Sequence, residues 1–145
     1  MQLMKIYAMR SMHLWMTILT CCAASGAQYY VDPNGTDSGS GTTISPWSLT
    51  AALSDNTLPT SPNRSLKGGD TVWLREGVYS GAFTSRLRGA TNAPIRVRQF
   101  PGHRATISGG VSSSLHVLTV LGGQVDFVDF EISHSSPDRE VERPF

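Results

Sequence analysis

Short apolar segments recur along this chain at intervals that limit how it can fold. From residue 70 onward, segments of four to eight residues rich in β-branched and aromatic side chains end in Gly, Pro, Asn or Ser. They span residues 71–74, 95–100, 105–108, 116–121 and 125–132. Val72 and Val97 are 25 residues apart, Val97 and Leu118 are 21 apart, and Ile107 and Phe130 are 23 apart. Such recurrence without intervening helices predicts a coil of parallel strands, a β-helix.

An antiparallel sandwich remains an alternative at this point, because it also consists of short strands separated by turns. In either fold, alternate apolar side chains face the core. The residues expected to point inward are Val72, Leu74, Ile95, Val97, Ile107, Leu118, Val120, Val128, Phe130 and Ile132.

One helix is expected, over residues 46–53. Ser45 is the candidate N-cap, and Pro46 would take the first helical position, where its missing N–H is not needed. We expect this helix to lie across the N-terminal end of the coil, where it would shield apolar side chains and unpaired strand edges from water.

The first 27 residues have the organisation of a secretory signal peptide. Lys5 and Arg10 precede an uncharged apolar run over residues 14–24, and small residues follow at 25–27. The run is shorter than the ~20 residues that span a bilayer, so a retained anchor is disfavoured. A lipoprotein acylated at Cys21 or Cys22 is a weaker alternative. We predict a signal peptide at 1–27, one domain at 28–145, a secreted, extracellular or periplasmic location, and no membrane contact after cleavage.

Composition excludes several classes of protein. The 12 Lys+Arg residues nearly balance the 11 Asp+Glu residues, so nothing favours a nucleic-acid partner. Both cysteines lie within the expected signal peptide, so the mature chain would have neither disulfides nor a Cys-ligated zinc site. Stability must therefore come from burial of apolar side chains.

Three stretches of the sequence resemble one family. They are YVDPNGTD at residues 30–37, GDTVWLREGVY at 69–79 and GATNAPIRV at 89–97. Together they resemble the N-terminal part of right-handed parallel β-helix proteins of the pectate-lyase-like superfamily, nearest in pattern to polysaccharide lyases of the chondroitinase B and alginate lyase type. The resemblance implies an all-β, right-handed parallel β-helix (solenoid) with a short N-terminal capping helix. Because a solenoid is capped at both ends, we expect a chain truncated after about three turns.

Calcium is the cofactor that the resemblance implies, since it neutralises the uronate group of the substrate in such lyases. Asp129 and Glu131 alternate with apolar residues in the segment 125–132, so both carboxylates are expected on one outer face of a strand. Carboxylates converging from one face could bind calcium. The alternative is that both are simply solvated.

Arginines form the other candidate site. Arg96 and Arg98 are expected on the outer face of one strand, among a wider set comprising Arg86, Arg88 and Arg104. Guanidinium groups bind carboxylate and sulfate in a bidentate way, which points to an acidic polysaccharide. The competing interpretation is a solvated face that pairs with Glu76 or Asp70. Among the histidines, His134 has the most site-like position, directly after the last expected strand.

Two functional hypotheses follow. The preferred one is the N-terminal part of a secreted lyase that cleaves uronate-containing polysaccharides by β-elimination, with most catalytic residues beyond this segment and a monomeric full-length protein. The alternative is a non-catalytic extracellular module that binds carbohydrate. A hydrolase with paired carboxylates is a third, weaker hypothesis, because Asp126 and Asp129 are isolated from other acids.

Overall fold

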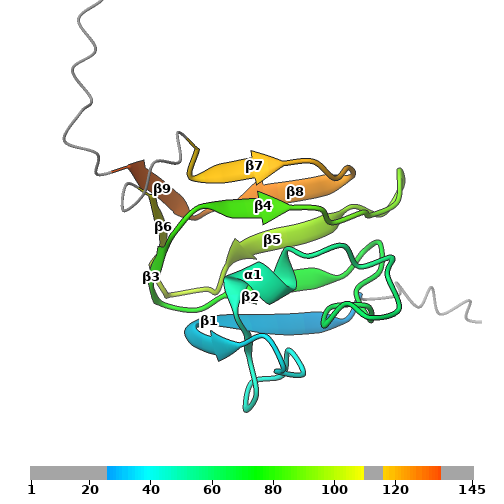
Figure 1. Cartoon of the computed structure of the whole chain (residues 1–145), viewed down its shortest axis with the longest axis horizontal. Coiled ribbons are helices and arrows are strands. Elements are labelled where there is room, and N and C mark those ends of the chain that lie inside the picture. The colour runs from blue at the N-terminus through cyan, green and yellow to red at the C-terminus, as the bar shows by residue number, and fades with distance from the viewer. Residues whose placement is uncertain (1–25, 110–115, 135–145) are drawn as a thin grey trace, which may run out of the picture.

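The strands of this protein form a parallel β-helix, in which successive turns of one coil stack on each other (Figure 1). The computed structural model describes residues 26–109 and 116–134. Most of the expected signal peptide, and the acidic residues Asp138, Glu140 and Glu142, lie outside the described residues.

The described part of the chain contains one short helix and nine strands. In chain order these are β1 (Gln28–Thr36), α1 (Leu49–Ala52), β2 (Thr71–Leu74), β3 (Gly77–Ser80), β4 (Phe83–Ser85), β5 (Ile95–Gln99), β6 (Ala105–Gly109), β7 (Leu118–Val120), β8 (Val125–Val128) and β9 (Glu131–His134).

The strands form three sheets, and the chain visits them in the same order on each turn. The first sheet has the order β1-β2-β5-β8, the second β3-β6-β9 and the third β4-β7. All six strand pairs between these elements are parallel, which excludes the antiparallel sandwich. In Figure 1 the first sheet is seen stacked from β1 to β8, with the second sheet at one end of these strands. The predicted all-β solenoid is confirmed.

The intervals between turns were predicted only in part. Val72 does pair with Val97, 25 residues further on. Val97, however, pairs with Phe127 rather than with Leu118, which belongs to the third sheet and pairs with Phe83. The loops at the corners differ in length, so a constant interval does not identify which strands stack.

The core lies inside the coil and is almost entirely apolar. Five residues expected to point inward are at most 1% exposed: Val72, Leu74, Ile95, Val97 and Ile107. Leu118 and Phe130 are half-buried. Val128 is wrongly predicted, because it lies in register with outward-facing Arg98. The core also includes residues outside the prediction: Val31, Trp47, Leu49, Ala51, Ala52, Leu53, Leu66, Tyr79, Leu87, Ala105 and Val117.

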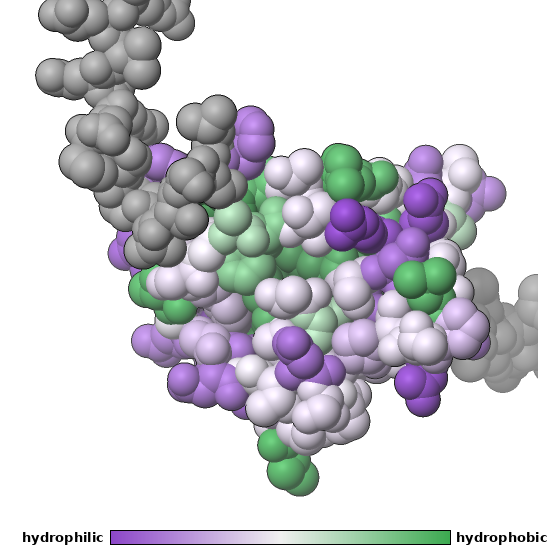
Figure 2. All heavy atoms as spheres, viewed as in Figure 1, coloured by the Kyte–Doolittle hydropathy of each residue, from purple (hydrophilic) through white to green (hydrophobic). Residues whose placement is uncertain are grey.

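The last described rung of the coil exposes apolar side chains. Ile132 lies in register with buried Ile107 but is 51% exposed, and Val120 lies in register with buried Ser85 but is 50% exposed. No further strand of the described residues stacks on β7, β8 or β9. Figure 2 shows hydrophobic residues gathered at the upper edge of the view, around β7.

The helix is shorter than expected and begins later. Ser48, not Ser45, is its N-cap, because the Ser48 hydroxyl accepts a hydrogen bond from the amide of Ala51 at 3.0 Å. Trp47 is not helical, since it forms parallel bridges to Val31 and Thr36 of β1. The helix contacts β1 and β4, so it stands where a strand of the third sheet would stand in the first turn. Within residues 26–109 and 116–134, no helix is long and apolar enough to cross a membrane.

A buried tyrosine joins the first and second turns. The Tyr79 hydroxyl lies 2.9 Å from the carbonyl oxygen of Arg75 and 3.1 Å from that of Val31, and the residue is 3% exposed. Burial raises the pKa of the Tyr79 phenol far above its usual value, and the nearby Asp32 carboxylate raises this pKa further. The neutral, hydrogen-bonded form is therefore the one that the fold requires.

Replacing Tyr79 by phenylalanine is expected to lower the free energy of unfolding by about 1 kcal/mol at pH 7, because the hydrogen bond of its hydroxyl group is lost. A tyrosine whose pKa is raised by folding contributes stability that is lost as pH rises above its unfolded pKa of about 10. Urea denaturation measures the free energy of unfolding of the wild type and of Tyr79→Phe. The difference between these two free energies should therefore be smaller at pH 11 than at pH 7. An unchanged difference would contradict the assignment.

Candidate functional site

The outer surface of the first sheet carries a row of aromatic and basic side chains in register. Tyr30 of β1 pairs with Trp73 of β2, and Trp73 pairs with Arg98 of β5. Their chain neighbours Val72 and Val97 point into the core, so these three side chains point outward. We call this surface the outer face; its strand residues are Gln28, Tyr30, Thr71, Trp73, Arg96, Arg98, Asp126 and Val128.

Phe100, which follows β5, connects the aromatic rings at one end of the outer face. Its ring centroid lies 5.6 Å from that of Trp73 in an edge-to-face arrangement and 6.1 Å from that of Tyr30. The His103 ring lies 4.9 Å from Phe100, and its Nδ1 accepts a hydrogen bond from the Glu76 amide at 3.0 Å. All these rings are half-buried, so each keeps part of its surface open to a ligand.

Two arginines lie over the aromatic rings. The guanidinium carbon of Arg98 is 5.4 Å from the centre of the Trp73 ring, and that of Arg75 is 5.6 Å from the centre of the Tyr30 ring. Cation–π contact at these distances is attractive and favours a guanidinium group beside each ring. The outer face therefore combines flat apolar surfaces with oriented positive charges.

Arg96 and Arg98 pair with acids of the next turn of the coil, whereas Arg75 pairs with Asp32 of β1 in the preceding turn. Arg98 forms an ion pair with Asp129, and the Nε of Arg96 lies 3.9 Å from a carboxylate oxygen of Asp126. The expectation that these arginines pair with Glu76 or Asp70 is wrong. The Asp70 carboxylate instead accepts hydrogen bonds from the backbone amides of residues 27 and 67. These ion pairs are partly exposed, which makes them weak.

The expected arrangement of Asp129 and Glu131 on one strand face is wrong. Asp129 has a φ of +67° and forms the corner between β8 and β9, so the segment 125–132 is two strands in two sheets. Asp129 pairs with Arg98, whereas Glu131 accepts a hydrogen bond from Arg104 at 2.9 Å. That bond and the Arg104 charge hold the pKa of Glu131 below its usual value, and Thr106 adds to the effect.

As they are arranged, these carboxylates do not fit a calcium ion. Calcium takes six to eight oxygen ligands, and both acids are already paired with arginines, Asp129 with Arg98 of β5 and Glu131 with Arg104 just before β6. Across the part of the chain that the structure describes, no three His, Cys, Asp or Glu side chains are grouped so that they could hold a metal ion. Calcium binding by this protein stays a prediction.

Sequence reasoning found the arginines of the outer face but missed its aromatic residues. Arg96 and Arg98 share this face as predicted, whereas Tyr30, Trp73 and Phe100 were not among the candidates. The signal was present in the alternation of β2, where Trp73 stands between two core residues. His134 lies on β9 in register with Gly109, and the histidine of the outer face is His103.

Comparison with known proteins supports the fold alone. No protein-family model matches the chain, and no curated protein matches it. Among solved structures, the crystal structure of pectate lyase Pel9A is similar, with a TM-score of 0.57 and 23% sequence identity. The match covers 74% of this chain and 28% of that one, so this chain spans less than a third of that protein's length. This protein has a pectate-lyase-like parallel β-helix fold.

Proposed function

We propose that this protein acts on an acidic polysaccharide outside the cell, and that the polymer binds along the outer face. The observation that supports this proposal is the row of Tyr30, Trp73 and Arg98 in register across three turns, extended by Phe100 and Arg75. An acidic polysaccharide offers both apolar C–H faces for the rings and anionic groups for the guanidinium groups.

The chemistry of each group suits a chain of acidic sugars. Aromatic rings present an apolar surface on which the C–H groups of a pyranose ring pack. Guanidinium groups bind carboxylate or sulfate in a bidentate way. The present partners of Arg96 and Arg98 are half-exposed aspartates, and such ion pairs contribute little stability. A uronate group could therefore replace Asp126 or Asp129 at small cost.

Cleavage by β-elimination is the reaction that we propose for the whole protein. In that reaction a base removes the proton beside the uronate carboxyl group, and the glycosidic C–O bond breaks to leave an unsaturated sugar. The similarity to a pectate lyase favours this chemistry over hydrolysis. In this proposal the outer face supplies the binding groups for a secreted, monomeric lyase of the chondroitinase B and alginate lyase type. A module that holds the polymer without cleaving it is the alternative.

The binding proposal predicts the effect of two substitutions on the outer face. Trp73→Ala and Arg98→Gln are each expected to weaken binding to alginate, polygalacturonate or chondroitin sulfate about tenfold, which corresponds to about 1.4 kcal/mol. Affinity electrophoresis with each polymer in the gel measures the change. Arg104→Gln is the matched control, because Arg104 is exposed and pairs with Glu131 on the second sheet.

Two results would decide the proposal. Wild-type affinity in both outer-face variants, or an equal loss in Arg104→Gln, would show that the polymer does not bind at this face. Cleavage is measured separately as the ultraviolet absorbance of the unsaturated product. Binding without such absorbance on any of the three polymers would favour the non-catalytic module over the lyase.

A further inference from the structure

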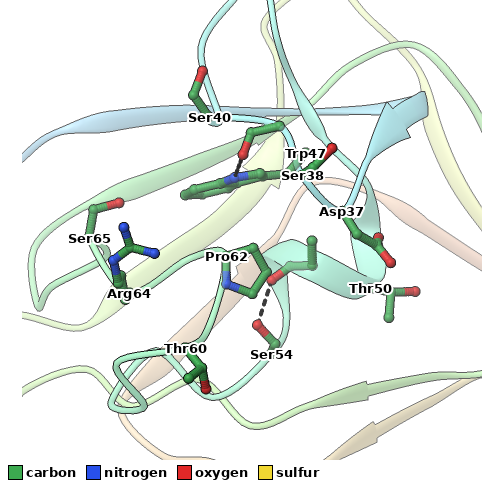
Figure 3. A pocket seen from close by; sticks show the side chains of 12 residues that line it. Asp37, Ser38, Ser40, Trp47, Thr50, Ser54, Thr60, Pro62, Arg64 and Ser65 are labelled. Carbon is green, nitrogen blue, oxygen red and sulfur yellow. Dashed lines mark hydrogen bonds between the residues drawn. The ribbon is translucent and has the colours of Figure 1, made fainter.

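A hollow lies beside the first turn of the coil, away from the outer face. It is open to solvent, has a volume of about 750 Å³ and is lined by the loop after β1, by α1 with its flanking residues, and by residues 60–65 (Figure 3). Small-molecule sites in proteins have volumes in this range. Tyr29 stacks on Trp47, which lines this cavity, whereas Tyr30, the next residue on β1, belongs to the outer face. The two sites thus lie on opposite sides of β1.

The wall of the cavity formed by Trp47 is held rigidly. The indole N–H of Trp47 donates a hydrogen bond to the carbonyl oxygen of Gly39 at 2.7 Å. One face of the indole stacks on the Tyr29 ring at 4.9 Å, with 13° between the planes. Gly41 lies against the same ring with a φ of +72°, and a Cβ at that position would come within 2.8 Å of it. The hydrogen bond and the ring stacking hold the indole in this position.

The opposite loop is fixed by a fully buried asparagine. The Asn63 side-chain amide donates hydrogen bonds to the carbonyl oxygens of Ala52 and Ser54, both at 2.9 Å. Its oxygen accepts a hydrogen bond from the Ser54 hydroxyl, also at 2.9 Å. Residues 60–65 are thereby held against the helix, so the cavity is formed before any ligand arrives, which lowers the entropic cost of binding.

Half of the residues that line this cavity carry a hydroxyl group, and Arg64 at one side is the cation among them. Figure 3 shows Arg64 with Ser65 on one side and Asp37 with Thr50 on the other. The Arg64 guanidinium is exposed and, unlike Arg75, Arg96, Arg98 and Arg104, takes part in no ion pair within the described ranges. The Asp37 carboxylate accepts a hydrogen bond from the Ser48 hydroxyl. Further hydroxyls on the lining come from Ser38, Ser40, Ser54 and Thr60.

We propose that this cavity binds one sugar residue that carries a carboxylate, a uronic acid. The unpaired guanidinium of Arg64 would hold the carboxylate in a bidentate way. The hydroxyl groups and the Asp37 carboxylate would hydrogen-bond the ring hydroxyls of the sugar. An ordinary anion site would need neither a cavity of this size nor a carboxylate in its wall. The inference does not depend on the function proposed for the outer face.

The test is a titration of the full chain with D-glucuronate, D-glucose and inorganic phosphate, followed by NMR. The indole N–H signals of Trp47 and Trp73 report separately on the cavity and on the outer face. We expect glucuronate to shift the Trp47 signal saturably, in the millimolar range. Glucose and phosphate should each bind at least about fivefold more weakly than glucuronate. Glucose lacks the carboxylate that would bind Arg64, and phosphate lacks the sugar hydroxyls.

Matched variants link binding to the cavity. Arg64→Gln is expected to weaken glucuronate binding at least about tenfold, whereas Arg86→Gln, an exposed arginine outside the cavity, should leave it unchanged. Thr60→Trp should also weaken binding by filling space while the cation stays in place. A Trp47 signal that does not respond to glucuronate, an Arg64→Gln variant with unchanged affinity, or phosphate that binds as tightly as glucuronate would overturn the proposal.

Discussion

Replacing Trp47 by alanine is expected to lower the free energy of unfolding by about 3–5 kcal/mol, the largest effect of any single substitution considered for this protein. Trp47 is 1% exposed, stacks on Tyr29 and donates a hydrogen bond to Gly39. It also ties the segment that leads into α1 to β1 through backbone pairing with Val31 and Thr36. Its removal would leave a large cavity beside the first turn. Urea denaturation followed by circular dichroism measures the loss.

Trp73→Ala is the control for this experiment, because it removes the same side chain from a half-buried position on the outer face. It is expected to cost less than about 1.5 kcal/mol, mainly through the lost packing against Phe100 and Arg98. The loss in free energy of unfolding should therefore be larger for Trp47→Ala than for Trp73→Ala, because Trp47 supports the fold whereas the proposed role of Trp73 is in binding. Equal destabilisation by both substitutions would contradict that division.

Asn63→Ala is expected to destabilise the protein by about 2–4 kcal/mol, since it leaves buried backbone carbonyls without their donor. Asn63 is 0% exposed and connects the loop that precedes β2 to residues 52 and 54. It also lies in a potential N-glycosylation sequence, Asn63-Arg64-Ser65, but a buried, fully bonded amide is not open to modification.

Asn34→Ala provides the comparison, because Asn34 is exposed on β1 and its side chain makes no hydrogen bond to any residue that the structure describes. It should change the free energy of unfolding by less than about 0.5 kcal/mol. If Asn63→Ala were as mild as Asn34→Ala, the loop over residues 60–65 would not be held as the structure indicates, and the cavity beside α1 would not be preformed.

The coil could be predicted from the sequence, whereas the stacking of its turns could be predicted only in part. The 25-residue interval from Val72 to Val97 reflects a real rung of the first sheet. Ile107 pairs with Ile132, two residues beyond the expected Phe130. The corner at Asp129 changes the alternation between β8 and β9, so Phe127 rather than Val128 lies in register with the core residue Val97. Corner geometry of this kind depends on a positive φ at a single residue, which an apolar pattern does not reveal.

The candidate site could also be predicted only in part, because the register between turns of the coil determines which side chains lie together. Arg96 and Arg98 were found because they alternate with core residues on one strand. Tyr30 and Phe100 come from other turns, and only the register between turns places their rings beside Trp73. The N-cap was misplaced for a related reason: Pro46 and Trp47 suit a helix start locally, but pairing of Trp47 with β1 keeps them extended.

The central claim is that the outer face binds an acidic polysaccharide, and calorimetric titration of the wild-type chain tests it most directly. Alginate, polygalacturonate and chondroitin sulfate would be compared with a neutral glucan of similar length. We expect saturable binding to at least one acidic polymer, at least about tenfold tighter than to the glucan and weakened by added salt as arginine contacts are screened. Equal affinity for acidic and neutral polymers, or binding to none of them, would contradict the account.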